Sequence, residues 1–258
     1  MIYVHKNNLL NKIASDYKGY SREISDFYNN HYLPTKKSLE EISFSAEDKN
    51  AFCKAANLIN DYYNKIEIFS NKYSITSQSK FASTFLEEIS VYLFQDLPEL
   101  KNDEFGVFNK KIYAGMKINK DKKIGLITKD VDFCIGKKVN ISIDNQPTTE
   151  LILPVVAVEV KTYLDATMFG EIKSSSKAIR SASPNSKTYV LMGYKCLADE
   201  HIIAARQDSA LSEMFVLRKN EKSPIEAEAL YLYWLEITKA IKDVSRDDKI
   251  TVPGRLLR

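Results

Sequence analysis

The chain has 258 residues, of which 44% are apolar, so it can bury one sizeable core and need not be divided into two domains. A formal net charge of +3 permits an anionic partner without requiring one, and its three cysteines have neither disulfide-framework nor zinc-ribbon spacing. The first residues lack a signal-peptide apolar region, and no apolar run reaches membrane-spanning length, so we expect a cytoplasmic protein and not a membrane-embedded one.

The N-terminal part of the chain has a helical pattern. Residues 8–64 carry apolar side chains at spacings of three and four, with breaks expected at residues 31–35. A second helix is predicted over residues 81–94, where the apolar positions again form one stripe. Glu88 lies at the margin of this stripe and Glu87 lies opposite it. A carboxylate at such a margin can reach a metal site at the edge of the core.

Short alternating runs, typical of strands, follow this helix. We predict strands over residues 111–118, 125–128, 131–135 and 139–143, with turns at residues 136–138 and 144–147. Residues 151–163 form the most hydrophobic predicted strand. Pro154 indicates that this strand bends there or begins pairing only after that point.

The remaining elements alternate between helix and strand. Asp165 is the expected N-cap of a helix that ends near residue 182, and residues 188–194 form another buried strand. A final helix is predicted over residues 224–244, with Ser223 and Glu226 as its capping box.

This order of elements predicts an α/β fold in which helices cover both faces of a mixed sheet. We expect a single domain over residues 1–258. Residues 81–194 would be its core, and residues 1–80 and 195–258 would be helical additions at its two ends.

Charged residues interrupt the most hydrophobic strand at one place, Glu159-Val160-Lys161. Side chains two residues apart in a strand point to the same face, and burying either charge unpaired is costly. The loose pattern of an acid, any residue and a lysine recurs elsewhere, for example at Glu171-x-Lys173, and has no value by itself. Here it closes a buried strand and follows, one hairpin earlier, a strand that opens with Asp130 and Asp132.

Two carboxylates and a lysine in this setting indicate phosphodiester chemistry. Hydrolysis of a phosphodiester requires a cation beside the phosphate and a group that favours hydroxide over water. Mg²⁺ takes hard oxygen ligands and keeps several waters, so Asp132, Glu159 and the carbonyl of Val160 suffice to hold it. Lys161 would position the attacking water.

Asp132 and the Glu159-Val160-Lys161 segment resemble the motif of the PD-(D/E)XK nuclease superfamily, and the α-β-β-β-α-β order over residues 81–194 resembles its common core. Members often add a carboxylate from the preceding helix, a role that Glu88, or failing that Glu87, would match. The motif's proline is missing before both aspartates, so Asp130 remains the alternative to Asp132.

Within the superfamily the chain is most similar to type II restriction endonucleases. The resemblance implies sequence-specific hydrolysis of double-stranded DNA, dependence on Mg²⁺, products with 5′-phosphate ends and a homodimer. It also implies that residues 1–80 serve recognition or dimerisation.

Other readings of these residues stay open. The aspartates can begin a strand at its solvated edge, and Glu159 with Lys161 can be a cross-strand ion pair, in a non-catalytic nucleic-acid-binding protein with the same fold. A repair or junction nuclease that recognises DNA shape is a third candidate. The helix after the strand has a basic face that can hold DNA phosphates or simply be solvated, formed by Lys173, Lys177 and Arg180.

Overall fold

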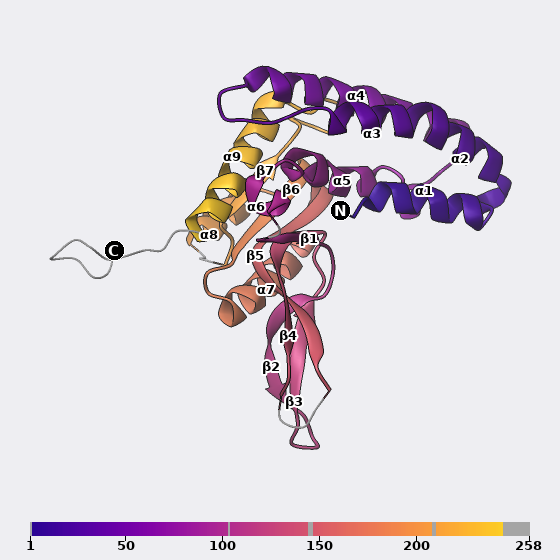
Figure 1. Ribbon diagram of the computed structural model, residues 1–258. Helices are drawn as coiled ribbons and strands as arrows, with labels where there is room; N and C mark the ends of the chain where they lie inside the picture. The colour runs from indigo at the N-terminus through magenta and orange to yellow at the C-terminus, as the bar shows by residue number, and fades with distance from the viewer. Residues whose placement is uncertain (1, 103, 144–146, 208–209, 245–258) are drawn as a thin grey trace.

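The computed structural model describes residues 2–102, 104–143, 147–207 and 210–244. Within them, seven strands form one mixed sheet with helices on both faces, which confirms the predicted α/β fold (Figure 1). The strands are β1 (Gly106–Phe108), β2 (Ile112–Ile118), β3 (Ile124–Lys129), β4 (Phe133–Ile141), β5 (Thr149–Leu164), β6 (Lys187–Lys195) and β7 (Glu213–Val216). The α-helices are α1 (Val4–Ala14), α2 (Ser21–Phe27), α3 (Leu33–Glu40), α4 (Lys49–Lys72), α5 (Ser83–Phe94), α6 (Pro98–Lys101), α7 (Ala166–Ala182), α8 (Asp199–Gln207) and α9 (Ala227–Val244).

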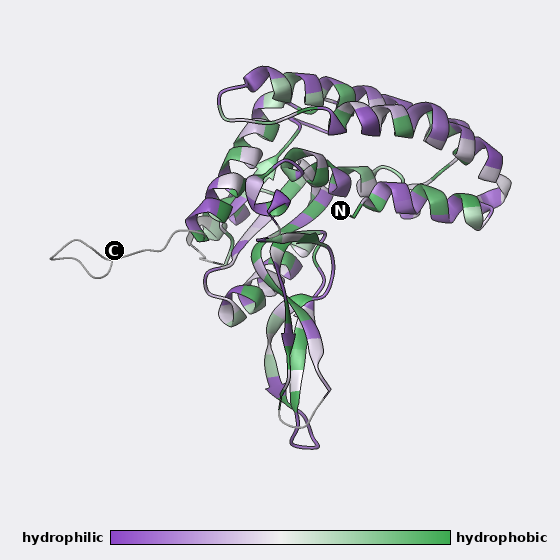
Figure 2. Cartoon of the chain, viewed as in Figure 1, coloured by the Kyte–Doolittle hydropathy of each residue, from purple (hydrophilic) through white to green (hydrophobic). Residues whose placement is uncertain are grey.

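Strand β5 is the centre of the sheet. It pairs antiparallel with β4 along one edge, and along the other edge it pairs parallel with β6 and, through Ile112 and Ile152, with β2. Val156, Val158 and Val160 pack into a core shared with α4, α5 and α9, while Ala157 points to the opposite face and packs with residues of α7. A strand buried on both faces has to be apolar nearly throughout, which explains the run at residues 151–163. Figure 2 shows this apolar centre.

Two adjoining hairpins extend away from the body of the molecule (Figure 1). One is the β2–β3 ribbon, residues 112–129, and the other is formed by the second half of β4 and the first half of β5. The turn predicted at residues 136–138 is wrong, because β4 is continuous. A bulge in the pairing accommodates the close backbone approach at Gly136, where an added Cβ would lie 2.3 Å from the Leu153 carbonyl oxygen.

Of the two alternatives predicted at Pro154, a bend in the strand or pairing that begins only afterwards, the second is wrong. Gly136 is the partner of Pro154, and the five residues of β5 before Pro154 pair with β4 as well. A bulge places proline where no ladder hydrogen bond is needed from its nitrogen. Of the turn predicted at residues 144–147, residues 144–146 lie outside the described part of the chain.

The N-terminal helices break at other places than predicted. Residues 31–35 do not interrupt the helix, because a π-helical turn, η2 (Tyr28–Tyr32), joins α2 directly to α3. Pro34 lies in the first turn of α3, where a missing N–H costs little. The chain instead leaves the helix after α1, through the 3₁₀ turn η1 (Tyr17–Gly19), and between α3 and α4. Asp48 then caps α4 by accepting from the amides of Asn50 and Ala51.

Helix α9 begins at Ala227, three residues later than predicted. The expected capping residue, Ser223, instead hydrogen-bonds with Asn220. Ile225 is buried, and its backbone exchanges two hydrogen bonds with the side chain of Asn60 in α4, so this segment is held against α4 and cannot join the helix. No described helix is long and apolar enough to cross a membrane.

Candidate active site

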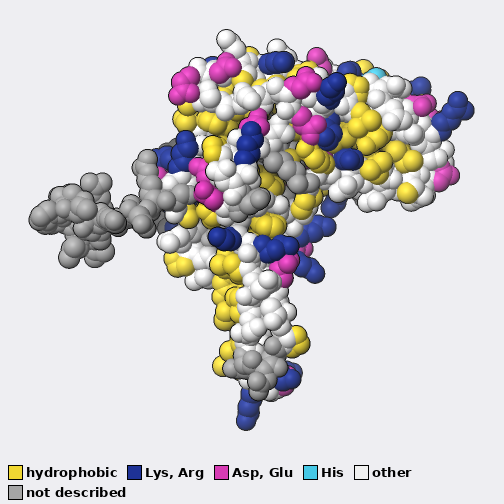
Figure 3. Space-filling view, in the orientation of Figure 1, with side chains coloured by type: hydrophobic (Ala, Val, Ile, Leu, Met, Phe, Trp, Pro, Cys, Tyr) yellow, Lys and Arg dark blue, Asp and Glu magenta, His cyan; other side chains and the backbone are white. Residues whose placement is uncertain are grey.

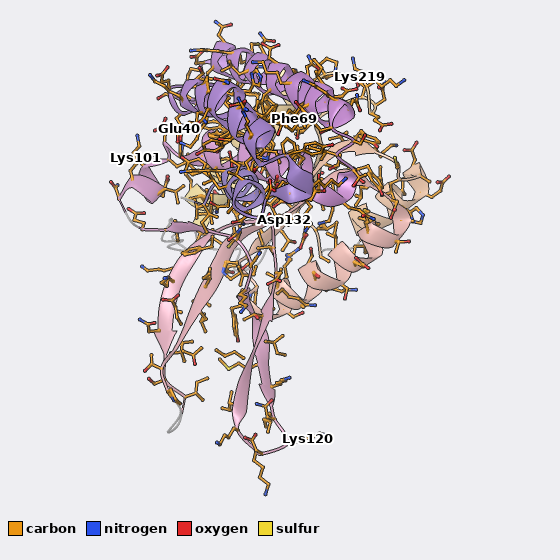
Figure 4. All side chains as sticks on the ribbon, turned by 90° about the vertical axis from the view of Figure 1, so that its right-hand side faces the viewer. Glu40, Phe69, Lys101, Lys120, Asp132 and Lys219 are labelled. Carbon is orange, nitrogen blue, oxygen red and sulfur yellow. The ribbon has the colours of Figure 1, made fainter. Side chains whose placement is uncertain are left out.

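Asp132, Glu159 and Lys161 lie together where β4 begins and β5 nears its end. The two strands are antiparallel, with Phe133 opposite Val158, so the residue before β4 is brought beside the last third of β5. Glu159 and Lys161 alternate with the buried valines of β5 and therefore share the face of the sheet that α7 covers. Figure 4 shows Asp132 between the helical layer and the two hairpins.

The three side chains are in direct contact. The Lys161 Nζ atom lies 3.3 Å from Asp132 Oδ2 and 3.2 Å from Glu159 Oε2. The backbone amide of Val160 donates to Asp132 Oδ2 at 2.7 Å. Since the N–H and C=O of a strand residue point to the same edge, the Val160 carbonyl also faces Asp132. The side chains of Asp132, Glu159 and Lys161 are 26%, 16% and 32% exposed, so the site is partly screened from water and still open to a ligand.

The charges at this site are strongly coupled. Burial raises the pKa of the Glu159 carboxyl, and the neighbouring Asp132 raises it further, against the opposing effect of Lys161. Burial disfavours the charged form of Lys161, but Asp132 and Glu159 outweigh it, and the pKa of the ammonium is raised. Lys161 is therefore a cation at neutral pH, beside two acids whose proximity to each other favours a further cation.

Glu87 of α5 is a third acidic group in this electrostatic environment. Burial and then the charge of Asp132 raise the pKa of Glu87 to about 7, while Lys80, Lys161 and Lys110 lower it. Glu87, the second of the two predicted accessory carboxylates, thus responds to the charge of Asp132, and its role at the site stays a prediction.

Glu88 is fully buried in a polar network with the N-terminal helices. Its Oε2 accepts from the backbone amides of His5, at 2.8 Å, and Lys6, at 3.1 Å. Its Oε1 accepts from the hydroxyls of Tyr32, at 2.8 Å, and Tyr92. Four donors occupy both carboxyl oxygens, so Glu88 joins α5 to α1 and η2 and does not serve the acidic site.

His5 extends this network and is held neutral. Its Nδ1 lies 2.9 Å from the Thr84 hydroxyl, which itself donates to the Lys80 carbonyl, so Nδ1 carries the hydrogen and Nε2 accepts from the Tyr62 hydroxyl at 2.8 Å. Burial lowers the pKa of His5 to about 3.

We therefore expect His5 to make the folded protein acid-sensitive. Because its pKa is lower in the folded than in the unfolded chain, its contribution to stability is complete above about pH 6.5 and falls as the pH decreases toward 3. Chemical denaturation should show a loss of about 2–3 kcal/mol from this group between about pH 7 and pH 4.5. His5→Gln should be less stable at neutral pH but lose less on acidification, and an equal loss in both proteins would contradict this assignment.

Asp130 makes a structural contact and does not join Asp132, Glu159 and Lys161. Its Oδ1 accepts from the backbone amide of Lys111 at 3.1 Å, and the Lys110 amide donates to the Val131 carbonyl at 2.8 Å. These bonds fasten the connection between β1 and β2 to the start of β4. Of the two aspartates, Asp132 is the one that contacts Lys161, and its role as the metal ligand stays a prediction.

The basic side chains of α7 lie outside this triad. Lys177 is exposed, and Lys173 and Arg180 are partly exposed. The Lys173 ammonium lies 5.6 Å from the centre of the Phe169 ring, on the same helix. Their position on the helix that directly follows β5 is compatible with contacts to phosphates, which stay a prediction.

The donor set at the site fits a hard divalent cation. It offers the carboxylates of Asp132 and Glu159 and one main-chain carbonyl, as Mg²⁺ requires when it keeps several waters. Among the residues that the structure describes, no three His, Cys, Asp or Glu side chains enclose a metal position by themselves.

A mixed α/β sheet with two carboxylates and a lysine at this position is the arrangement expected of the restriction-endonuclease class of nucleases. In agreement, the sequence model of the Bpu10I restriction endonuclease family matches residues 78–236, and the chain belongs to that family. It is also similar to a solved chain of the native BbvCI A2B2 tetramer, with 17% sequence identity and a TM-score of 0.79 over 96% of this chain and 99% of that chain. A search of curated proteins gives no match.

Proposed function

We propose that this protein is a type II restriction endonuclease that hydrolyses both strands of specific DNA sites in a Mg²⁺-dependent reaction and leaves 5′-phosphate ends. Membership of a restriction endonuclease family supports a nuclease acting on DNA. The observation that carries the proposal is the convergence of Asp132, Glu159 and Lys161, because these are the groups that the reaction requires at one place.

The residues have distinct roles in this proposal. Asp132, Glu159 and the Val160 carbonyl would hold Mg²⁺, which when bound offsets charge on the scissile phosphate. Lys161 orients the attacking water by hydrogen bonding and favours its deprotonated form by charge. The Val160 amide fixes the orientation of Asp132. Glu87, with its pKa near neutrality, is suited to exchange a proton with a water in the same space.

We further propose that residues 1–80 and 195–258 supply the surfaces for DNA recognition and for association with another chain. A homodimer would place two such sites on the two DNA strands. The similar BbvCI structure is an A2B2 assembly, which makes a complex with a second, different chain the alternative. Light scattering of the purified protein, alone and with proteins encoded beside it, separates the two.

Plasmid and phage DNA incubated with the purified protein test the proposed activity. We expect discrete fragments with Mg²⁺, none with EDTA, and recovery when excess Mg²⁺ is restored. Random nicking would favour a shape-directed repair or junction nuclease. DNA binding without cleavage, in the presence of any companion chain, would favour the non-catalytic protein and overturn the proposal.

A further inference from the structure

The β2–β3 ribbon, which extends away from the body of the molecule, has an excess of positive charge. It contains five lysines and one acidic residue, Asp121. Four of the lysines are exposed and lie at or next to the turn: Lys117, Lys120, Lys122 and Lys123. Like charges this close repel each other, so their clustering costs stability unless an anion neutralises them.

None of these four lysines has a carboxylate partner in the described part of the chain. Lysines elsewhere do, as at Lys138 with Glu150 in the neighbouring hairpin and Lys101 with Asp96. The carboxylate of Asp121 accepts from the backbone amide of Lys123, which shapes the turn. The ammonium groups at the tip of the ribbon therefore form no ion pair with the described part of the chain and are available to an anionic ligand.

The ribbon also exposes large apolar side chains to the solvent. Ile118 is 77% exposed and Met116 is 49% exposed, on the same face of β2. Exposed apolar side chains beside unpaired cations are compatible with a surface that contacts both the sugars and the phosphates of DNA.

The position and the length of the β2–β3 ribbon also indicate a DNA ligand. Figure 4 shows the ribbon running from the level of Asp132 to its tip at Lys120, and Figure 3 shows basic side chains at that tip. The seven residues of β2 span about 24 Å, which is roughly seven base pairs at 3.4 Å per pair. A two-stranded ribbon also fits the width of the DNA major groove.

We propose that the β2–β3 ribbon is a DNA-binding arm that holds duplex flanking the cleavage site, with the lysines of its tip on the phosphate backbone. This rests on the proposed function and adds a substrate contact remote from the reacting atoms. The arm increases affinity at moderate salt and takes no part in the chemical step.

The test compares two charge-neutralising variants of the full chain. The arm variant is Lys117→Gln, Lys120→Gln and Lys123→Gln, which leaves Lys122 and its left-handed backbone, with φ of +63°, unchanged. The control removes three exposed lysines that lie outside the ribbon, outside α7 and outside the proposed recognition regions: Lys101→Gln, Lys138→Gln and Lys187→Gln. Fluorescence anisotropy with a random-sequence duplex in EDTA, over a series of salt concentrations, gives the slope of log K against log salt.

The arm variant should lose about two to three units of this slope, since each phosphate contact contributes roughly 0.9, while the control should keep it. Replacing the same three arm lysines with arginine should restore the slope. After the cut site is mapped, the nuclease footprint of the arm variant should be shorter by several base pairs on one side.

Two outcomes overturn this inference. One is an unchanged slope in an arm variant that melts at the wild-type temperature, and the other is an equal fall in the control. If the wild-type protein cleaves DNA in either case, the proposed nuclease function stands, and only the DNA-binding role of the ribbon is wrong. If the wild-type protein neither binds nor cleaves DNA, both fail.

Discussion

Asp132→Asn is expected to lower the rate of DNA cleavage by about three orders of magnitude, whereas Asp130→Asn should cleave at nearly the wild-type rate. Asp132 touches Lys161 and the Val160 amide inside the site. Asp130 instead fixes a turn through the Lys111 amide. The two substitutions are chemically identical and two residues apart, so a difference between them reports position alone.

Initial rates on a mapped duplex substrate, with saturating Mg²⁺, measure this difference. DNA binding in EDTA should be retained by both variants, which separates loss of chemistry from loss of affinity. If Asp130→Asn were the inactive protein, or if both variants cleaved normally, Asp132 would not be a ligand of the reaction centre. Thermal melting serves as the folding control for each.

The sequence allows the site to be predicted because it combines two strong constraints. A strand buried on both faces has to be apolar, so the charged pair Glu159 and Lys161 stands out against residues 151–163. An antiparallel hairpin then brings the start of β4 to the end of β5, and the aspartate at that start meets the pair. Local pattern and topology are enough here, because the side chains involved are only one strand spacing apart.

The same reasoning does not predict the contacts of Glu88 on α5. The pattern predicts an amphipathic helix with one buried stripe, yet α5 is buried on nearly every side, by the sheet and by the N-terminal helices together. On such a helix, a carboxylate near the apolar stripe meets polar partners from distant parts of the chain. Only tertiary structure shows that Tyr32 and the amide of His5 reach Glu88.

Errors in element boundaries have a similar origin. The pattern at Gly136 predicts a turn over residues 136–138, but Lys137 and Lys138 are exposed on a strand that continues through them. Local capping chemistry predicts that α9 begins at residue 224, but the hydrogen bonds of Ile225 with Asn60 hold that segment out of the helix. β1 and β7, of three and four residues, are too short for a periodic signal.

Glu88→Ala should destabilise the folded protein by about 3–5 kcal/mol, the largest effect on stability that we expect from one substitution outside the acidic site. It would leave two tyrosine hydroxyls and two backbone amides buried without their acceptor. Glu88→Gln keeps an acceptor oxygen at nearly the same volume and should cost about 1–2 kcal/mol. Urea denaturation at neutral pH measures both.

The neighbouring Glu87 provides the matched comparison. Glu87→Gln should change stability by less than about 1 kcal/mol, because burial and Asp132 already disfavour its charge, but it should slow cleavage and alter the dependence of the rate on pH near 7. Adjacent residues on one helix would then separate stability from activity, Glu88 by fastening α5 to α1 and η2 and Glu87 by acting beside Asp132. If the folded Glu88→Gln protein lost cleavage as completely as Glu87→Gln at temperatures well below its melting point, this division of roles would be wrong.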